Sequence, residues 1–209
     1  MGVVLVKKII IKKLFGWLIA EIAERVNSRS LLSYDELVEL IEQGVINADI
    51  ANVNATSIDL TLADKLLVEG SPRFDGVVSL DKGETIGTNP VSINKERGYV
   101  MGRGEFVLGS TQEVFNLPDD ISAEYKLKSS MARSSLDHLN AGWIDAGFEG
   151  TITLELKSMS NNHELKIAPG MLIGQVVFFR HKKVPKHASY ASKGRYNGQL
   201  EVTASKGIR

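Results

Sequence analysis

The feature that most restricts the fold of this 209-residue chain is a series of short apolar runs between Leu66 and Val114. The runs read LLVEG, GVVSL, GYVMG and EFVLGS, and Gly, Pro, Asn and Asp separate them. Runs of this length are typical of β-strands and are too short for ordinary helices. The spacing therefore predicts a mainly β body of short strands with few helices.

Three further segments predict strands of the same body. VNATSIDLTL (53–62) alternates apolar and polar residues from Ser57 onward. TITLELK (151–157) alternates in the same way, so Glu155 falls on the face opposite the apolar residues. MLIGQVVFF (171–179) is almost continuously apolar, which is consistent with a strand buried on both faces.

The sequence before residue 45 has a different character. Ser33 has the position of a helix N-cap, with Glu36 three residues on as in a capping box, and this helix should end near Gly44. Residues 1–30 mix aliphatic runs with lysines, without the roughly 20 uncharged residues needed to span a bilayer. A helical apolar stripe over 14–26 would suit a membrane surface or a partner subunit. We favour the plainer interpretation, an extension docked on the body or a dispensable leader.

The amino-acid composition argues against several kinds of partner and catalytic site. Lys plus Arg and Asp plus Glu both total 25, so no overall positive field favours nucleic acid as a partner. The absence of cysteine excludes disulfides, a thiol nucleophile and thiolate metal ligands, and it fits a reducing cytoplasm. The 4 histidines are scattered without metal-ligand spacing, so neither a zinc site nor any other protein-bound metal is expected.

Side chains able to do chemistry are concentrated between residues 128 and 156. KSSMAR (128–133) offers hydroxyl donors and positive charge, Asp145 lies in the turn-like WIDAGF, and Glu155 is a carboxylate on a polar strand face. Each has a plainer explanation by itself: a solvated helix start, an Asx-turn residue and a surface glutamate. Their combination within one stretch favours a functional site.

With these motifs, the chain resembles the dCTP deaminase branch of the trimeric dUTPase-like superfamily over roughly residues 31–209. Six motifs occur in the family's order: VNATSIDLTL (53–62), KSSMAR (128–133), AGWIDAGFEG (141–150), TLEL (153–156), PGMLIGQVVF (169–178) and YASKGRYNGQ (190–199). The resemblance implies a distorted β-barrel or jelly-roll-like domain at 31–185, preceded by the extension at 1–30. It also implies a C-terminal lid at 186–209, for which a frayed terminus is the alternative. Family members assemble as homotrimers that share active sites between subunits.

The resemblance also implies catalytic roles. Glu155 would take a proton from water and return it to the leaving ammonia without a metal. Ser129 would hold the water or the exocyclic group, and Arg133 would orient Glu155. Burial beneath a nucleotide would raise the pKa of Glu155, and Arg133 would oppose that rise. Asp145 would contact the deoxyribose 3′-hydroxyl and, in members that also cleave the triphosphate, help to activate the water that attacks the α-phosphorus.

Further nucleotide contacts follow from the same motifs. They are implied for Lys128, Ser129, Ser130, Met131, Ala132, Arg133, Asp145, Phe148, Thr153, Leu154, Glu155, Gln175, Tyr190, Arg195 and Gln199. Phe148 would stack on the sugar and crowd out a ribose 2′-hydroxyl. Lys128 stands where Arg is usual, so it keeps the charge but loses the bidentate fork. Mg²⁺ would be held by the triphosphate oxygens.

Three positions bear on the reaction. Pure dUTPases generally lack a carboxylate at the position of Glu155, so its presence favours deamination. Gly142 and Trp143 stand where deaminase-only members carry His-Arg, which favours the bifunctional members that convert dCTP to dUMP for thymidylate synthesis. Asn140 replaces a usual Thr and leaves regulation by dTTP open. A deaminase that stops at dUTP, a dUTPase and a non-catalytic nucleotide-binding interaction module remain alternatives.

Overall fold

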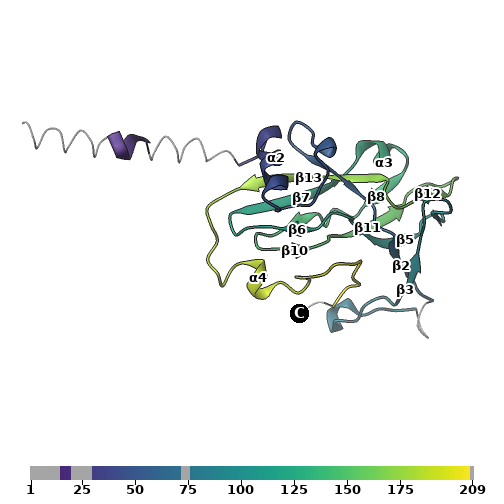
Figure 1. Cartoon of the computed structure of the whole chain (residues 1–209). Coiled ribbons are helices and arrows are strands. Elements are labelled where there is room, and N and C mark those ends of the chain that lie inside the picture. Colours follow the sequence, from purple (N-terminus) through teal and green to yellow (C-terminus); the bar gives the residue numbers. More distant parts are fainter. Residues whose placement is uncertain (1–14, 20–29, 72–75, 208–209) are drawn as a thin grey trace, which may run out of the picture.

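The computed structural model describes residues 15–19, 30–71 and 76–207 of the chain (Figure 1). The strands are β1 (Ile58–Thr61), β2 (Lys65–Glu69), β3 (Thr88–Ser92), β4 (Tyr99–Met101), β5 (Phe106–Ser110), β6 (Phe115–Asn116), β7 (Ile121–Leu127), β8 (Leu136–His138), β9 (Trp143–Ile144), β10 (Glu149–Gly150), β11 (Thr153–Ser158), β12 (Leu165–Ile167) and β13 (Leu172–Arg180). The helices are α2 (Tyr34–Glu42), α3 (Ser129–Arg133) and α4 (Tyr190–Lys193), with 3₁₀ turns η1 (Ile50–Asn52) and η2 (Leu80–Lys82). The prediction of a mainly β chain with few short helices is confirmed.

Two antiparallel sheets make up the body. One has four strands in the order β1-β13-β7-β9, and the other has five in the order β3-β2-β5-β11-β8. The pairs β10-β6 and β12-β4 complete the pairing, and the described strands do not close into a single ring. Figure 1 shows α2 on one side of β13 and β7, with the yellow C-terminal segment running along the opposite side of the body.

The predicted alternation of β11 is confirmed. Leu154 and Leu156 are fully buried in the core, whereas Thr153, Glu155 and Lys157 are only partly buried. Because successive side chains of a strand point to opposite faces, Glu155 lies on the side away from the core that Leu154 and Leu156 fill.

Two expectations for individual strands are wrong. Residues 76–80 form no strand, because the Ser79 carbonyl accepts from the backbone N–H groups of Lys82 and Glu84, which turns the chain into η2. The strand of this region is instead β3, whose Pro90 is tolerated because β3 is an edge strand. β13 is not buried on both faces: Val176 and Phe178 are fully buried, but the residues between and after them are partly exposed.

The N-terminal helix prediction is confirmed for α2. The Glu36 carboxylate accepts hydrogen bonds of 3.0 Å from both the backbone N–H and the hydroxyl of Ser33, and the helix ends at Glu42, just before Gly44. Of the predicted stripe at 14–26, only 15–19 are described; they are helical, with Phe15 and Trp17 each 63% exposed. The remainder of the stripe lies outside the described residues.

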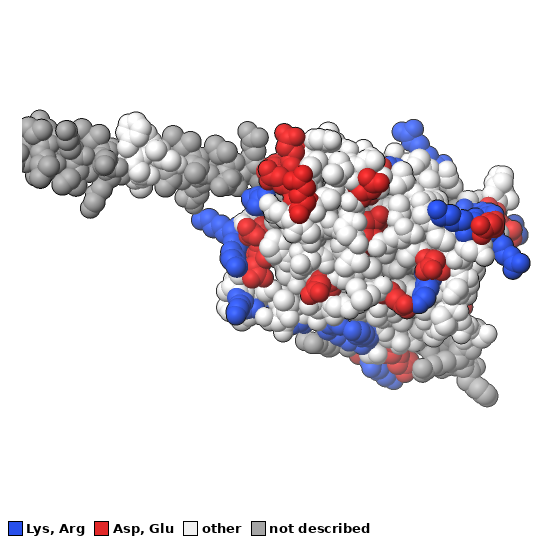
Figure 2. All heavy atoms as spheres, viewed as in Figure 1, with Lys and Arg blue, Asp and Glu red and all other residues white. Residues whose placement is uncertain are grey.

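The described part of the chain contains no helix long and apolar enough to cross a membrane. Acidic and basic side chains are interspersed over the face in Figure 2, with acidic ones gathered over α2. This distribution agrees with a net charge of zero.

Candidate active site

A cavity of about 380 Å³ is lined by both main sheets and by the C-terminal segment. β5, β8 and β11 contribute one wall, β7 and β9 another, and residues between Tyr190 and Ser205 contribute the third. The volume is within the range of pockets that bind small molecules.

Three titratable side chains meet on the lining of this cavity. Tyr125 comes from β7, His138 from β8 and Glu155 from β11. Tyr125 and His138 are only 2% and 4% exposed, and their rings meet edge to face with centroids 4.5 Å apart. His138 Nε2 lies 3.6 Å from Glu155 Oε2, which is beyond hydrogen-bond distance. Sequence analysis missed His138 and Tyr125, because the strand pairing that brings them to Glu155 is not visible in local patterns.

Burial governs the protonation of this cluster. It raises the pKa of Glu155 and lowers the pKa of His138. Burial, together with the charge of Glu155, also raises the pKa of Tyr125. The lowered His138 pKa favours a neutral imidazole, so the 3.6 Å contact with Glu155 is not an ion pair at neutral pH. A carboxyl group with a raised pKa suits general acid–base chemistry near neutrality.

The turn between β9 and β10 carries two of the predicted site residues. Trp143 Nε1 donates to Asp145 Oδ1 at 3.1 Å, and the Phe148 N–H donates to the Asp145 carbonyl at 3.2 Å. Asp145 and Phe148 both line the cavity. The Phe148 ring packs edge on against Tyr190, with centroids 5.6 Å apart, which links this turn to the C-terminal segment.

The C-terminal segment lies along the cavity of its own chain. Gln199 forms a parallel bridge with Gly150, and its side-chain Nε2 donates to the Thr151 carbonyl at 2.7 Å. Tyr190, Tyr196 and Gln199 line the cavity. The Arg195 guanidinium instead donates to carbonyl groups of the same segment and does not line the cavity.

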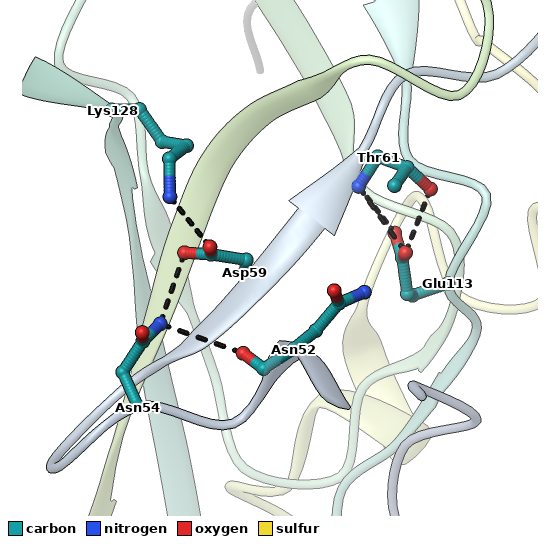
Figure 3. Close-up of polar contacts among 6 residues, drawn as sticks. All are labelled: Asn52, Asn54, Asp59, Thr61, Glu113 and Lys128. Carbon is teal, nitrogen blue, oxygen red and sulfur yellow. Dashed lines mark hydrogen bonds and ion pairs between the residues drawn. The ribbon is translucent and has the colours of Figure 1, made fainter. Parts of the chain in front are cut away.

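The Ser/Arg segment lies outside this cavity. Ser129, Ser130 and Arg133 are exposed on α3, and none of them lines the cavity. The helix begins after Lys128, whose Nζ lies 2.5 Å from Asp59 Oδ2 on β1 (Figure 3). Asn54 Nδ2 donates to the other Asp59 oxygen at 3.1 Å, so this network ties the start of α3 to β1.

One chain thus brings together only part of the predicted site. The cavity gathers Asp145, Phe148, Thr153, Glu155, Tyr190 and Gln199. The predicted residues that do not line it are Lys128, Ser129, Ser130, Met131, Ala132, Arg133, Leu154, Gln175 and Arg195. Among the described residues, no group of three or more His, Asp or Glu side chains is arranged to hold a metal ion.

The chain is similar to proteins of one family. The family model described as dCTP deaminase-like matches residues 31–181. The dUMP-forming dCTP deaminase of Persephonella marina is 34% identical over 171 residues, covering 82% of this chain and 92% of that protein. The dUMP-forming dCTP deaminase of Beutenbergia cavernae is 37% identical over 161 residues, covering 76% and 83%. The crystal structure of 2′-deoxycytidine 5′-triphosphate deaminase from Agrobacterium tumefaciens aligns with a TM-score of 0.58 at 22% identity, over 73% of this chain and 49% of that one, and shares the fold.

Proposed function

Because the chain belongs to the dCTP deaminase-like family, we propose that it converts dCTP and water into dUMP, ammonia and pyrophosphate. The observation that carries the proposal is the Glu155 carboxyl group, which lines the cavity with its Oε2 buried and its pKa raised. The dUMP-forming relatives favour a reaction that continues past dUTP. The dUMP would supply thymidylate synthesis.

In the deamination step, water adds to C4 of the cytosine ring and Glu155 accepts its proton. The same group then returns the proton to the nitrogen, the C–N bond breaks, and ammonia leaves. The raised pKa supports this double role, because a group that both takes and gives a proton works best when its pKa is close to the operating pH.

For cleavage of the triphosphate we assign Asp145 and Phe148. Asp145 would contact the 3′-hydroxyl and help to activate the water that attacks the α-phosphorus, while Phe148 would stack on the deoxyribose. Support comes from their shared position on the cavity wall, where Phe148 packs against Tyr190 of the C-terminal segment, which also contributes Gln199 to the lining. Those two residues would contact the nucleotide from the C-terminal lid.

We infer that the triphosphate is bound by the Ser/Arg segment of a neighbouring copy in a homotrimer. The support is twofold: Ser129, Ser130 and Arg133 carry the donors such a group needs, and they are exposed away from the cavity of their own chain. Ser129 and Arg133 would thereby approach Glu155 across the subunit boundary. Mg²⁺ would enter with the substrate, bound to phosphate oxygens, and neutralise part of their charge.

Ammonia release from dCTP, measured for the wild type and for Glu155→Gln, tests the proposal. We expect the variant to lose about 10²–10⁴-fold in rate while it still binds dCTP. Binding of dCTP by the wild type without ammonia release above the variant would instead favour a non-catalytic module. Product analysis of the same reaction decides the second step: accumulation of dUTP without pyrophosphate would refute the bifunctional assignment and leave a deaminase.

A further inference from the structure

Two residues that line the cavity, Tyr125 and Glu155, carry buried polar atoms without a hydrogen-bond partner in the described part of the chain. The Tyr125 hydroxyl and Glu155 Oε2 are both buried, and neither has a hydrogen-bond partner among the described residues. Buried polar groups of folded proteins are almost always paired, so an orphaned donor and an orphaned acceptor in one cavity call for a common explanation. Both residues line the cavity and the charge of Glu155 acts on the Tyr125 phenol, so a small ligand that can both accept and donate would suit the two atoms.

The Tyr125 ring is held firmly in place. It packs edge to face with His138, and it lies against Gly174 so closely that any Cβ there would overlap the ring and its hydroxyl. A Cβ at Gly142 would likewise overlap the Tyr125 carbonyl. The Tyr125 N–H donates a hydrogen bond of 2.7 Å to the Gly142 carbonyl. Two glycines therefore make room for this tyrosine, and the hydroxyl cannot swing away to find a protein acceptor.

The chemistry of the hydroxyl is restricted as well. Burial and the nearby Glu155 charge raise the pKa of Tyr125, which keeps the phenol neutral and able to donate. Glu155, once ionised, only accepts. A water molecule between them would accept from the phenol and donate to the carboxylate, which satisfies both groups.

We propose that Tyr125 is a further catalytic residue, whose hydroxyl donates a hydrogen bond to the oxygen of the water that Glu155 deprotonates. The water O–H bond breaks, its proton passes to Glu155, and its oxygen bonds to C4 of the pyrimidine. Ammonia then leaves with the proton that Glu155 returns. The phenol orients the oxygen lone pair and is not consumed. This inference rests on the proposed function, because it concerns the deamination step.

Tyr125→Phe is the direct test, since it removes the hydroxyl and keeps the ring. With dCTP we expect kcat for ammonia release to fall by about 3- to 10-fold, the size of one lost hydrogen bond, with KM changed by less than about twofold. Pyrophosphate release from dUTP should stay at the wild-type rate, because that step uses another water. The melting temperature should not fall, since the hydroxyl that is removed has no protein partner.

Tyr34→Phe is the matched control, because Tyr34 is 48% exposed on α2 and does not line the cavity. Its kinetics should equal those of the wild type. An active wild type with an equally active Tyr125→Phe variant would overturn this inference and leave the proposed function intact. A rise in KM alone would also overturn it, by placing the hydroxyl on the nucleotide instead of the water. A wild type that releases no ammonia would remove the proposed function and this inference together.

Discussion

Replacing Lys128 by Met would leave the Asp59 carboxylate buried on β1 with a much weaker set of donors. In the described structure, Asp59 is contacted by the Lys128 ammonium at 2.5 Å and by the Asn54 amide at 3.1 Å. The side chains of Lys128 and Asp59 are 24% and 11% exposed, so water replaces the lost cation poorly. We expect a large loss of stability, because an uncompensated buried charge is costly.

The size of the expected stability loss follows from how deeply the Lys128–Asp59 pair is buried. Removing one partner of a fully buried ion pair costs about 3–5 kcal/mol, and the partial exposure of this pair lowers the expectation to about 2–3 kcal/mol. For a chain of this size each kcal/mol lowers the melting temperature by about 2–4 °C, so Lys128→Met should melt about 4–12 °C lower. Adding Asp59→Asn removes the unpaired charge and should recover part of this loss, with a coupling energy of about 1–2 kcal/mol.

Thermal and urea unfolding at one fixed protein concentration would measure the two single variants and the double variant. The pair Lys65 and Glu201 provides a control, because its side chains are 45% and 64% exposed. Lys65→Met and Glu201→Gln should couple by less than about 1 kcal/mol. Additive effects of Lys128→Met and Asp59→Asn, within about 0.5 kcal/mol, would refute the argument that this network anchors α3.

Two other substitutions have defined outcomes. Because the pKa of Glu155 is raised in the folded chain, its ionised form opposes folding above that pKa; Glu155→Gln should therefore melt about 2–4 °C higher at pH 8. This advantage should vanish below the ordinary value of 4.5, where the wild-type group is protonated in both states, and an equal gain at every pH would contradict the reasoning. Gly142→Ala should lower the melting temperature by about 2–10 °C, because its Cβ overlaps the Tyr125 backbone. Gly87→Ala, with open space at its Cβ, should melt within about 2 °C of the wild type and serves as control.

Local sequence patterns correctly predicted the elements whose formation depends on interactions between nearby residues. The two-residue period of β11 placed Glu155 on the correct face, and the capping residues Ser33 and Glu36 placed the start of α2. Both depend on neighbours a few residues apart, which a sequence displays directly. The same reasoning failed for residues 76–80 and for β13, because turn hydrogen bonds and exposure of a sheet face depend on contacts with the rest of the chain.

The sequence by itself determined the mainly β class and the family resemblance, and it predicted Glu155, Asp145 and the Ser/Arg segment as the groups able to do chemistry. Only the tertiary structure decided which of them share a cavity. Pairing of β8 with β11 brings His138 beside Glu155, the packing of Tyr125 against glycine adds a third group, and Lys128 is bound to Asp59. Such partners lie far apart along the chain, and burial, which sets their protonation, exists only after the sheets pack.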